Sequence, residues 1–333
     1  MLTRPRRNRK SESIRALVRE NMVTADDLVM PLFLVAGKKI NENITSLPVA
    51  NRQSLDVILK EIGQCLKLGI HSFIMFPKIP DELKDKTATY SFNPKNFYLL
   101  AAQKIKKKYP DITLISDVAL DPYNTDGHDG IVEDNEIKND ETLAVLEKMA
   151  VAQAKAGFDV IGPSDMMDGR VEAIRDALDL DGFPNTSIMS YTAKYASAFY
   201  GPFRDALDSA PVNDPSIPKD KKTYQMDPAN ANEALLEAEL DTLEGADFLM
   251  VKPAINYLDI ISLLKDNHSL PIAAYHVSGE CAMLIAACQN GWLDYKKAMP
   301  ESLLSIKRAG ADVIISYFAK DFMKLKLNQK VSL

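Results

Sequence analysis

The sequence contains little cysteine and none of the spacings that sulfur-dependent sites need. Among its 333 residues there are three cysteines, Cys65, Cys281 and Cys288, and no CxxC pair. An odd and sparse set argues against a disulfide framework and against a thiolate zinc site. The cysteines therefore predict a protein whose chemistry does not depend on sulfur ligands.

Long apolar runs, low-complexity stretches and an excess of positive charge are also missing. The longest nearly apolar run, residues 28–37, is too short to cross a bilayer. The 14 glycines and 18 prolines are too few for a disordered chain. A formal net charge of −6 argues against nonspecific nucleic-acid binding. Because the basic first ten residues lack an apolar signal segment, we expect a cytoplasmic globular protein with neither nucleic acid nor membrane as a partner.

Short apolar runs alternate with longer amphipathic segments along most of the chain. This is the pattern of βα units that build a parallel sheet. Helical periodicity is clearest at residues 55–68, 141–156 and 231–243. The runs that predict strands are 28–35, 71–76, 113–119, 158–161, 187–190, 248–251, 272–275 and 313–316.

Four glycines recur at predicted helix ends, just before the second, fourth, sixth and eighth strands. Glycine suits the left-handed conformation that often ends a helix. This regular recurrence favours a closed (β/α)8 TIM barrel over an open doubly wound sheet. We therefore predict an N-terminal arm at 1–27, a catalytic barrel at 28–333, and a long loop at 205–223 suited to act as a lid. The glycines are Gly69, Gly157, Gly245 and Gly310.

Two lysines follow strands at the end of the barrel where active sites are built. Lys252 follows the run 248–251 and precedes Pro253, while Lys194 follows the fifth strand among tyrosines and phenylalanines. Most lysines in such places extend their charge into solvent. In an apolar setting beside a second cation, however, a lysine loses proton affinity and becomes the neutral amine that a Schiff base requires.

The third predicted strand ends in an acidic loop, and this segment gathers Asp117, Asp121, Asp126, His128 and Asp129. Such a loop can be a solvated turn, which suits the residues farthest from the strand. Asp117 and Asp121 flank the strand end and favour binding of a cation. Oxygen ligands would suit Mg²⁺ rather than Zn²⁺.

Seven segments spread over nearly the whole chain form a highly specific pattern when taken together. They are MPLFLVAG, DVALDPYNTDGHDG, PSDMMDGRVEAIR, SYTAKYASAFYGPFRDA, YQMDPAN, MVKPA and AYHVSGE. These segments resemble the porphobilinogen synthase family, also called 5-aminolaevulinate dehydratase. The resemblance implies an aldolase-like barrel that joins two 5-aminolaevulinate molecules into porphobilinogen with loss of two waters, a step of tetrapyrrole biosynthesis.

The resemblance also implies roles for individual residues. Lys252 would form the Schiff base with the propionate-side substrate, and Lys194 would do so with the acetyl-side substrate. The residues implied to bind substrate are Arg204 and Lys221 at one carboxylate with Gln225 nearby, Ser278 and Tyr317 at the other, and Asp117.

Metal use and assembly are implied in the same way. Zinc-dependent members have cysteines where this chain has Ala119, Asp121 and Asp129, so the resemblance implies the magnesium-responsive branch with no zinc in the active site. An allosteric Mg²⁺ would be held at Glu237, largely through water, with Asp168 in support. Asp121 and Asp129 are candidates for an active-site cation. The family also implies a homo-octamer built from dimers whose arms wrap one another.

Two other functions stay open on the residues alone. One is a class I aldolase that uses a single lysine on the same scaffold. The other is an inactive barrel that senses a metabolite or acts as a scaffold. Two lysines at consecutive strand ends, together with cations for two carboxylates, favour the condensation of two identical keto acids.

Overall fold

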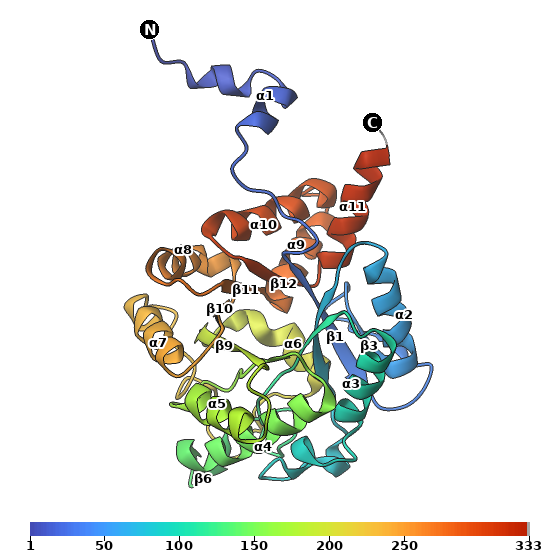
Figure 1. Cartoon of the computed structure of the whole chain (residues 1–333), viewed down its shortest axis with the longest axis vertical. Helices are drawn as coiled ribbons and strands as arrows, with labels where there is room; N and C mark the ends of the chain where they lie inside the picture. Colours follow the sequence, from blue (N-terminus) through green and yellow to red (C-terminus); the bar gives the residue numbers. More distant parts are fainter. Residues whose placement is uncertain (332–333) are drawn as a thin grey trace.

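The eight apolar runs form the strands of a closed parallel barrel in the computed structural model, which describes residues 1–331 (Figure 1). Strands that follow one another around the barrel pair in parallel, and the last pairs with the first to close the sheet. The predicted (β/α)8 barrel is therefore confirmed. The barrel strands are β1 (Leu28–Val35), β4 (Ser72–Pro77), β5 (Thr113–Ile115), β8 (Val160–Ile161), β9 (Ser187–Lys194), β10 (Phe248–Lys252), β11 (Ile272–His276) and β12 (Val313–Ser316).

Two strands differ from the predicted bounds in ways that matter for the site. Strand β9 continues through Lys194, so this lysine belongs to the strand instead of following it. Strand β5 is shorter than predicted and ends at Ile115. Beyond it the chain packs closely on Gly162, where a Cβ atom would lie 2.6 Å from the carbonyl oxygen of Ser116. Only glycine permits that approach of the two backbones.

Helices cover the outside of the barrel (Figure 1). In α2, Ile58, Ile62 and Cys65 recur at helical spacing and are buried. The three helices predicted from periodicity are confirmed as α2, α4 and α7. Within residues 1–331 no helix has the length and apolar character needed to span a membrane. The outer helices are α2 (Leu55–Leu66), α3 (Phe97–Lys108), α4 (Asn139–Ala156), α5 (Arg170–Leu180), α7 (Asn232–Leu243), α8 (Leu258–Asn267), α9 (Ser278–Gln289), α10 (Tyr295–Ala309) and α11 (Ala319–Val331).

The four glycines predicted at helix ends all have left-handed backbone. Their φ angles run from 84° at Gly69 to 120° at Gly310. At the end of α4, the N–H of Gly157 donates to the carbonyl oxygens of Gln153 and Ala154. These turns send the chain back into the barrel as the next strand begins.

The first residues of the chain extend away from the barrel (Figure 1). Within them, η1 (Pro5–Arg9) and α1 (Glu12–Leu17) contain no buried residue, and the first core residue along the chain is Val23. Two short hairpins are not predicted by the sequence pattern, because their strands are only three or four residues long and largely polar. They are β2 (Asn41–Asn43) with β3 (Asn51–Ser54), and β6 (Ile131–Glu133) with β7 (Glu136–Lys138).

A long segment after β9 folds over the acidic loop that follows β5. It begins with η4 (Ala198–Tyr200) and α6 (Gly201–Leu207), so a helix takes the first residues of the predicted loop. Farther along, the carbonyl oxygen of Pro218 lies 2.8 Å from Nε2 of His128 in the acidic loop. We refer to residues 198–225 as the lid.

Candidate active site

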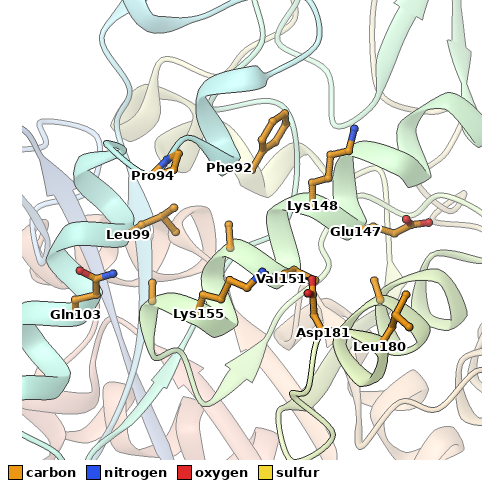
Figure 2. Close-up of a pocket in the computed structure, with 13 residues that line it drawn as sticks. Phe92, Pro94, Leu99, Gln103, Glu147, Lys148, Val151, Lys155, Leu180 and Asp181 are labelled. Carbon is orange, nitrogen blue, oxygen red and sulfur yellow. Dashed lines mark ion pairs between the residues drawn. The ribbon is translucent and has the colours of Figure 1, made fainter.

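A groove of about 560 Å³ lies on the outside of the barrel, between α3, α4 and α5 (Figure 2). Leu99 and Val151 line it, and Lys155 pairs with Asp181 at 3.4 Å. Neither of the predicted catalytic lysines lines this groove. The chemistry predicted from the sequence is therefore elsewhere.

The two lysines lie side by side at the carboxyl end of the barrel. Strands β9 and β10 are parallel neighbours, and their register pairs Lys194 with Lys252. Both side chains reach a small cavity of about 30 Å³, enough for a water-sized molecule. Eight of the residues predicted for the site line it: Asp117, Asp121, Asp129, Lys194, Arg204, Lys221, Gln225 and Lys252.

Lys252 is surrounded by the rings of Tyr191, Tyr200, Phe203 and Tyr275, which we call the aromatic wall. Its Nζ lies 4.8 Å from the ring centre of Tyr275, 4.9 Å from that of Tyr191 and 5.2 Å from those of Tyr200 and Phe203. Burial, followed by repulsion from Lys194, lowers the pKa of Lys252 to about 7. Near neutral pH a large fraction of this amine is unprotonated, which is the form that attacks a carbonyl.

Lys194, in contrast, has charged side chains as neighbours. Its Nζ lies 3.1 Å from Oδ2 of Asp129 and also donates to the carbonyl oxygen of Ser164. Lys221 of the lid lies 2.9 Å from the other oxygen of Asp129 and 3.0 Å from Oδ2 of Asp121. Burial opposes the charge of Asp129, but the two lysines outweigh it and hold the pKa of Asp129 below its ordinary value. The ammonium of Lys221 thus lies where an active-site cation was expected.

Asp117 differs from Asp121 and Asp129. Among the described residues, no lysine lies within hydrogen-bond distance of its carboxylate. The hydroxyl of Ser164 donates to its Oδ1 at 2.8 Å. Burial and the nearby charge of Asp121 raise the pKa of Asp117 to about 7. A carboxyl group with this pKa can both give and take a proton near neutral pH.

Ser278 and Tyr317, which the family resemblance also implied, do not line the cavity. The hydroxyl of Tyr317 lies 3.1 Å from that of Tyr275, whose ring contacts Lys252. Ser278 begins α9, and its Oγ is buried without a hydrogen-bond partner among the described residues. Because buried polar groups are almost always paired, this orphaned hydroxyl suits a polar ligand such as a carboxylate.

Glu237 and Asp168 share a second hollow, of about 410 Å³, behind the lid residues Tyr224 and Gln225. Burial raises the pKa of Glu237 to about 7, with Asp168 adding to the effect and Arg170 opposing it. Over residues 1–331 no three His, Cys, Asp or Glu side chains converge as metal ligands. The carboxylates that line the hollow are those of Asp168, Asp227, Glu233 and Glu237.

Comparison with known proteins decides the family. The family model described as delta-aminolevulinic acid dehydratase matches residues 2–325. The chain is 53% identical over 316 residues to the delta-aminolevulinic acid dehydratase of Bradyrhizobium diazoefficiens, covering 95% of this chain and 88% of that protein. It is 51% identical to the Chlamydia pneumoniae dehydratase over 322 residues, with 97% and 96% covered. The chain belongs to the delta-aminolevulinic acid dehydratase family.

A solved member of the dehydratase family has nearly the same fold. The structure of the Toxoplasma gondii enzyme in complex with porphobilinogen superposes with a TM-score of 0.95 at 48% identity, covering 99% of this chain and 94% of that one. The chain is thus a hydro-lyase that condenses two 5-aminolaevulinate molecules to porphobilinogen, in porphyrin biosynthesis. This result removes the aldolase and the inactive barrel as alternatives.

Sequence reasoning missed several residues of the dehydratase site, among them Tyr275 and Ser164. Tyr275 lies inside β11 and contacts Lys252 with its ring, and Ser164 bonds to Asp117 and Lys194 from the segment after β8. Both follow the rule that barrel strands end in site residues, so a systematic search of those ends would have found them. Their partners would still have stayed unknown.

Proposed function

We propose that the condensation proceeds through two imines, one on Lys252 and one on Lys194. The observation that carries the proposal is the register that places both amines at one cavity on adjacent strands. Each amine adds to the ketone of one substrate, and each imine forms with loss of one water. Two substrates held on neighbouring strand ends react as if in one molecule, which removes much of the entropic barrier.

The aromatic wall and the charged side of the cavity suit different steps. Lys252 attacks first because its neighbours favour the neutral amine. Lys194 must give up a proton before it attacks, and its ion pair with Asp129 brings it close to a carboxylate. Asp117, whose pKa is raised to about 7, is suited to move protons between the intermediates.

Binding of the substrate carboxylates is proposed at two places. Arg204 and Lys221 both belong to the lid and both line the cavity, with Gln225 beside them. Ser278 and Tyr317 do not line the cavity, but Tyr317 bonds to Tyr275 next to Lys252, and the buried hydroxyl of Ser278 is available to a ligand. Because the cavity holds about 30 Å³, the lid must move before two substrates enter.

Borohydride reduction in the presence of 5-aminolaevulinate tests the proposal. Reduction converts each imine to a stable amine, so mass spectrometry of peptides should find substrate on Lys252 and on Lys194. Substrate fixed on some other lysine, or on one lysine under every condition, would contradict the two-imine scheme.

We further propose that the enzyme responds to Mg²⁺ and needs no Zn²⁺. The support is the acidic hollow of Glu237 and Asp168 next to the lid, and the absence of thiol groups from the cavity lining. A bound Mg²⁺ would supply positive charge behind the lid. An active-site cation at Asp121 and Asp129 would have to displace the ammonium of Lys221.

Replacing Glu237 by alanine is expected to abolish activation by Mg²⁺ while leaving the basal rate. Activation of the parent enzyme should grow as pH rises through about 7, because the carboxyl of Glu237 then becomes charged. Glu239→Ala, on the exposed side of the same helix, is the matched control and should keep full activation. Activity of metal-free enzyme that returns with Zn²⁺ but not with Mg²⁺ would refute the proposal.

We propose a homo-octamer in which the arm of one subunit docks on another. The arm exposes apolar side chains without burying any in η1 or α1, and Leu17 is 85% exposed. Helix α7 likewise leaves Leu236, Leu240 and Leu243 uncovered at helical spacing. Apolar surface of this kind on two elements of one chain fits contacts between copies.

Deletion of residues 1–10 is expected to shift the protein toward smaller oligomers and to weaken activation by Mg²⁺. Light scattering measures the shift, and imine trapping on Lys252 serves as the control because the deletion does not touch the cavity. A truncated protein that stays octameric and responds normally to Mg²⁺ would show that the arm is dispensable.

We also propose a cytoplasmic location, without nucleic acid or membrane as a partner. All three cysteines are unpaired in the structure, which suits a reducing compartment. Cell fractionation with an antibody against the chain tests this location.

A further inference from the structure

Glu280 is a buried carboxylate that the proposed reaction leaves without a task. It lies in the first turn of α9 and is 2% exposed. In the part of the chain that the structure describes, no lysine, arginine or histidine forms an ion pair with it. Its oxygens instead accept hydrogen bonds from backbone N–H groups of Ile255 at 2.7 Å, Val277 at 2.9 Å and Ala254 at 3.4 Å.

These amides belong to two separate loops of the active site. Ala254 and Ile255 follow Lys252 by two and three residues, and Val277 directly precedes Ser278. One carboxylate therefore joins the loop that leaves β10 to the loop that leaves β11. An uncharged side chain would bind fewer of these donors, because a carboxylate is an acceptor on both oxygens.

We call these three hydrogen bonds the junction. Burying a carboxylate is costly, and the backbone amides of the junction offset part of that cost. Burial raises the pKa of Glu280 to about 7, although the backbone amides oppose the rise. The position at the start of a helix also favours a negative charge there. A cap on α9 alone needs only the bond to Val277, so the bonds to Ala254 and Ile255 serve the contact between the loops.

The same turn of α9 also contacts the base of the lid. A Cβ atom on Gly279 would lie 2.4 Å from the carbonyl oxygen of Phe199 in η4. In the same short helix, the hydroxyl of Tyr200 lies 2.7 Å from the carbonyl oxygen of Tyr195 and 3.1 Å from that of Lys252, and it donates between the two. The backbone of Lys252 is thus held from the lid side by Tyr200, and the loop after it is held from the α9 side by Glu280.

We infer that Glu280 is a positioning residue, which fixes the spacing between the amine of Lys252 and the hydroxyl of Ser278. This inference rests on the imine proposed at Lys252 and the carboxylate binding proposed at Ser278. A substrate anchored at both points requires a constant distance between them, and the junction at Glu280 supplies it. The hydrogen bonds of Glu280 given above reach the loops after β10 and β11 and not β9, which carries Lys194.

The test compares imine trapping at the two lysines in Glu280→Gln. This variant keeps the shape of the side chain but turns an amide N–H₂ toward a backbone N–H. We expect borohydride trapping at Lys252 to slow by about tenfold or more and trapping at Lys194 to change less than about twofold. Glu301→Gln, an exposed carboxylate on α10, is the matched control and should trap at both lysines at the parent rate.

A second variant covers the case in which Glu280→Gln fails to fold. Glu280→Asp keeps the charge on a shorter side chain, and we expect it to fold with a smaller loss at Lys252 and again little change at Lys194. Equal losses at both lysines in either variant, or a parent rate at Lys252 in a folded Gln variant, would overturn the inference. If borohydride fixes no substrate on either lysine of the parent enzyme, the two-imine proposal itself is refuted.

Discussion

Lys252→Ala is expected to abolish porphobilinogen formation, with a loss of at least about 10³-fold, because no other amine can take over the first imine. The neighbouring Lys194 is held by Asp129, and Lys221 is held by Asp121 and Asp129. Borohydride should then fix no substrate at position 252. A colorimetric assay for porphobilinogen measures the rate, and near-normal turnover would refute the assignment.

The pH dependence of imine formation gives a second test of Lys252. Its pKa is lowered to about 7 by burial and by Lys194. The amine is therefore mostly unprotonated above pH 7 and becomes protonated, and unreactive, as the pH falls through 7. Trapping at Lys252 should therefore rise between about pH 6 and pH 8 and then level off. A rise only near the ordinary lysine range would show that the aromatic wall does not desolvate the amine.

Lys194→Ala is expected to lose most of the activity, about 10²-fold or more, while still trapping one substrate on Lys252. The reason is that the second imine cannot form, whereas the aromatic pocket of Lys252 is untouched. Removing the positive charge also removes a cause of the lowered pKa of Lys252. Trapping at Lys252 should thus need a higher pH than in the parent enzyme.

Lys194→Arg is the matched control for this shift. Arginine keeps the charge but forms no imine under these conditions, so activity should be lost while the pH dependence at Lys252 stays near that of the parent. The same shift in both variants would show that the charge at position 194 does not act on Lys252. Trapping of two substrates in either variant would refute the role of Lys194.

The barrel could be predicted from the sequence because its signals are local and repeated. A glycine such as Gly157, which ends α4 with φ 97°, must lie within a few residues of the strand that it introduces. Chain order then places β9 beside β10, so the neighbourhood of Lys194 and Lys252 follows once the barrel is assumed.

The contacts of the lid could not be predicted in this way. Lys221 bonds to Asp121 across 100 residues, and no periodic pattern connects the lid to the acidic loop. The junction at Glu280 is equally hidden, because its partners are backbone amides, which any sequence carries. The roles proposed for Arg204 and Ser278 rest on the family resemblance and not on spacing.

In the structure, carboxylates of the protein itself occupy the ammonium of Lys221. Its ammonium is already paired with the carboxylates of Asp121 and Asp129 before a substrate arrives. If a substrate carboxylate binds Lys221 as proposed, it would replace one of these carboxylates and would not add a new ion pair. A small anion would have to make the same exchange without the imine that holds the substrate, so we expect small anions to compete weakly at Lys221.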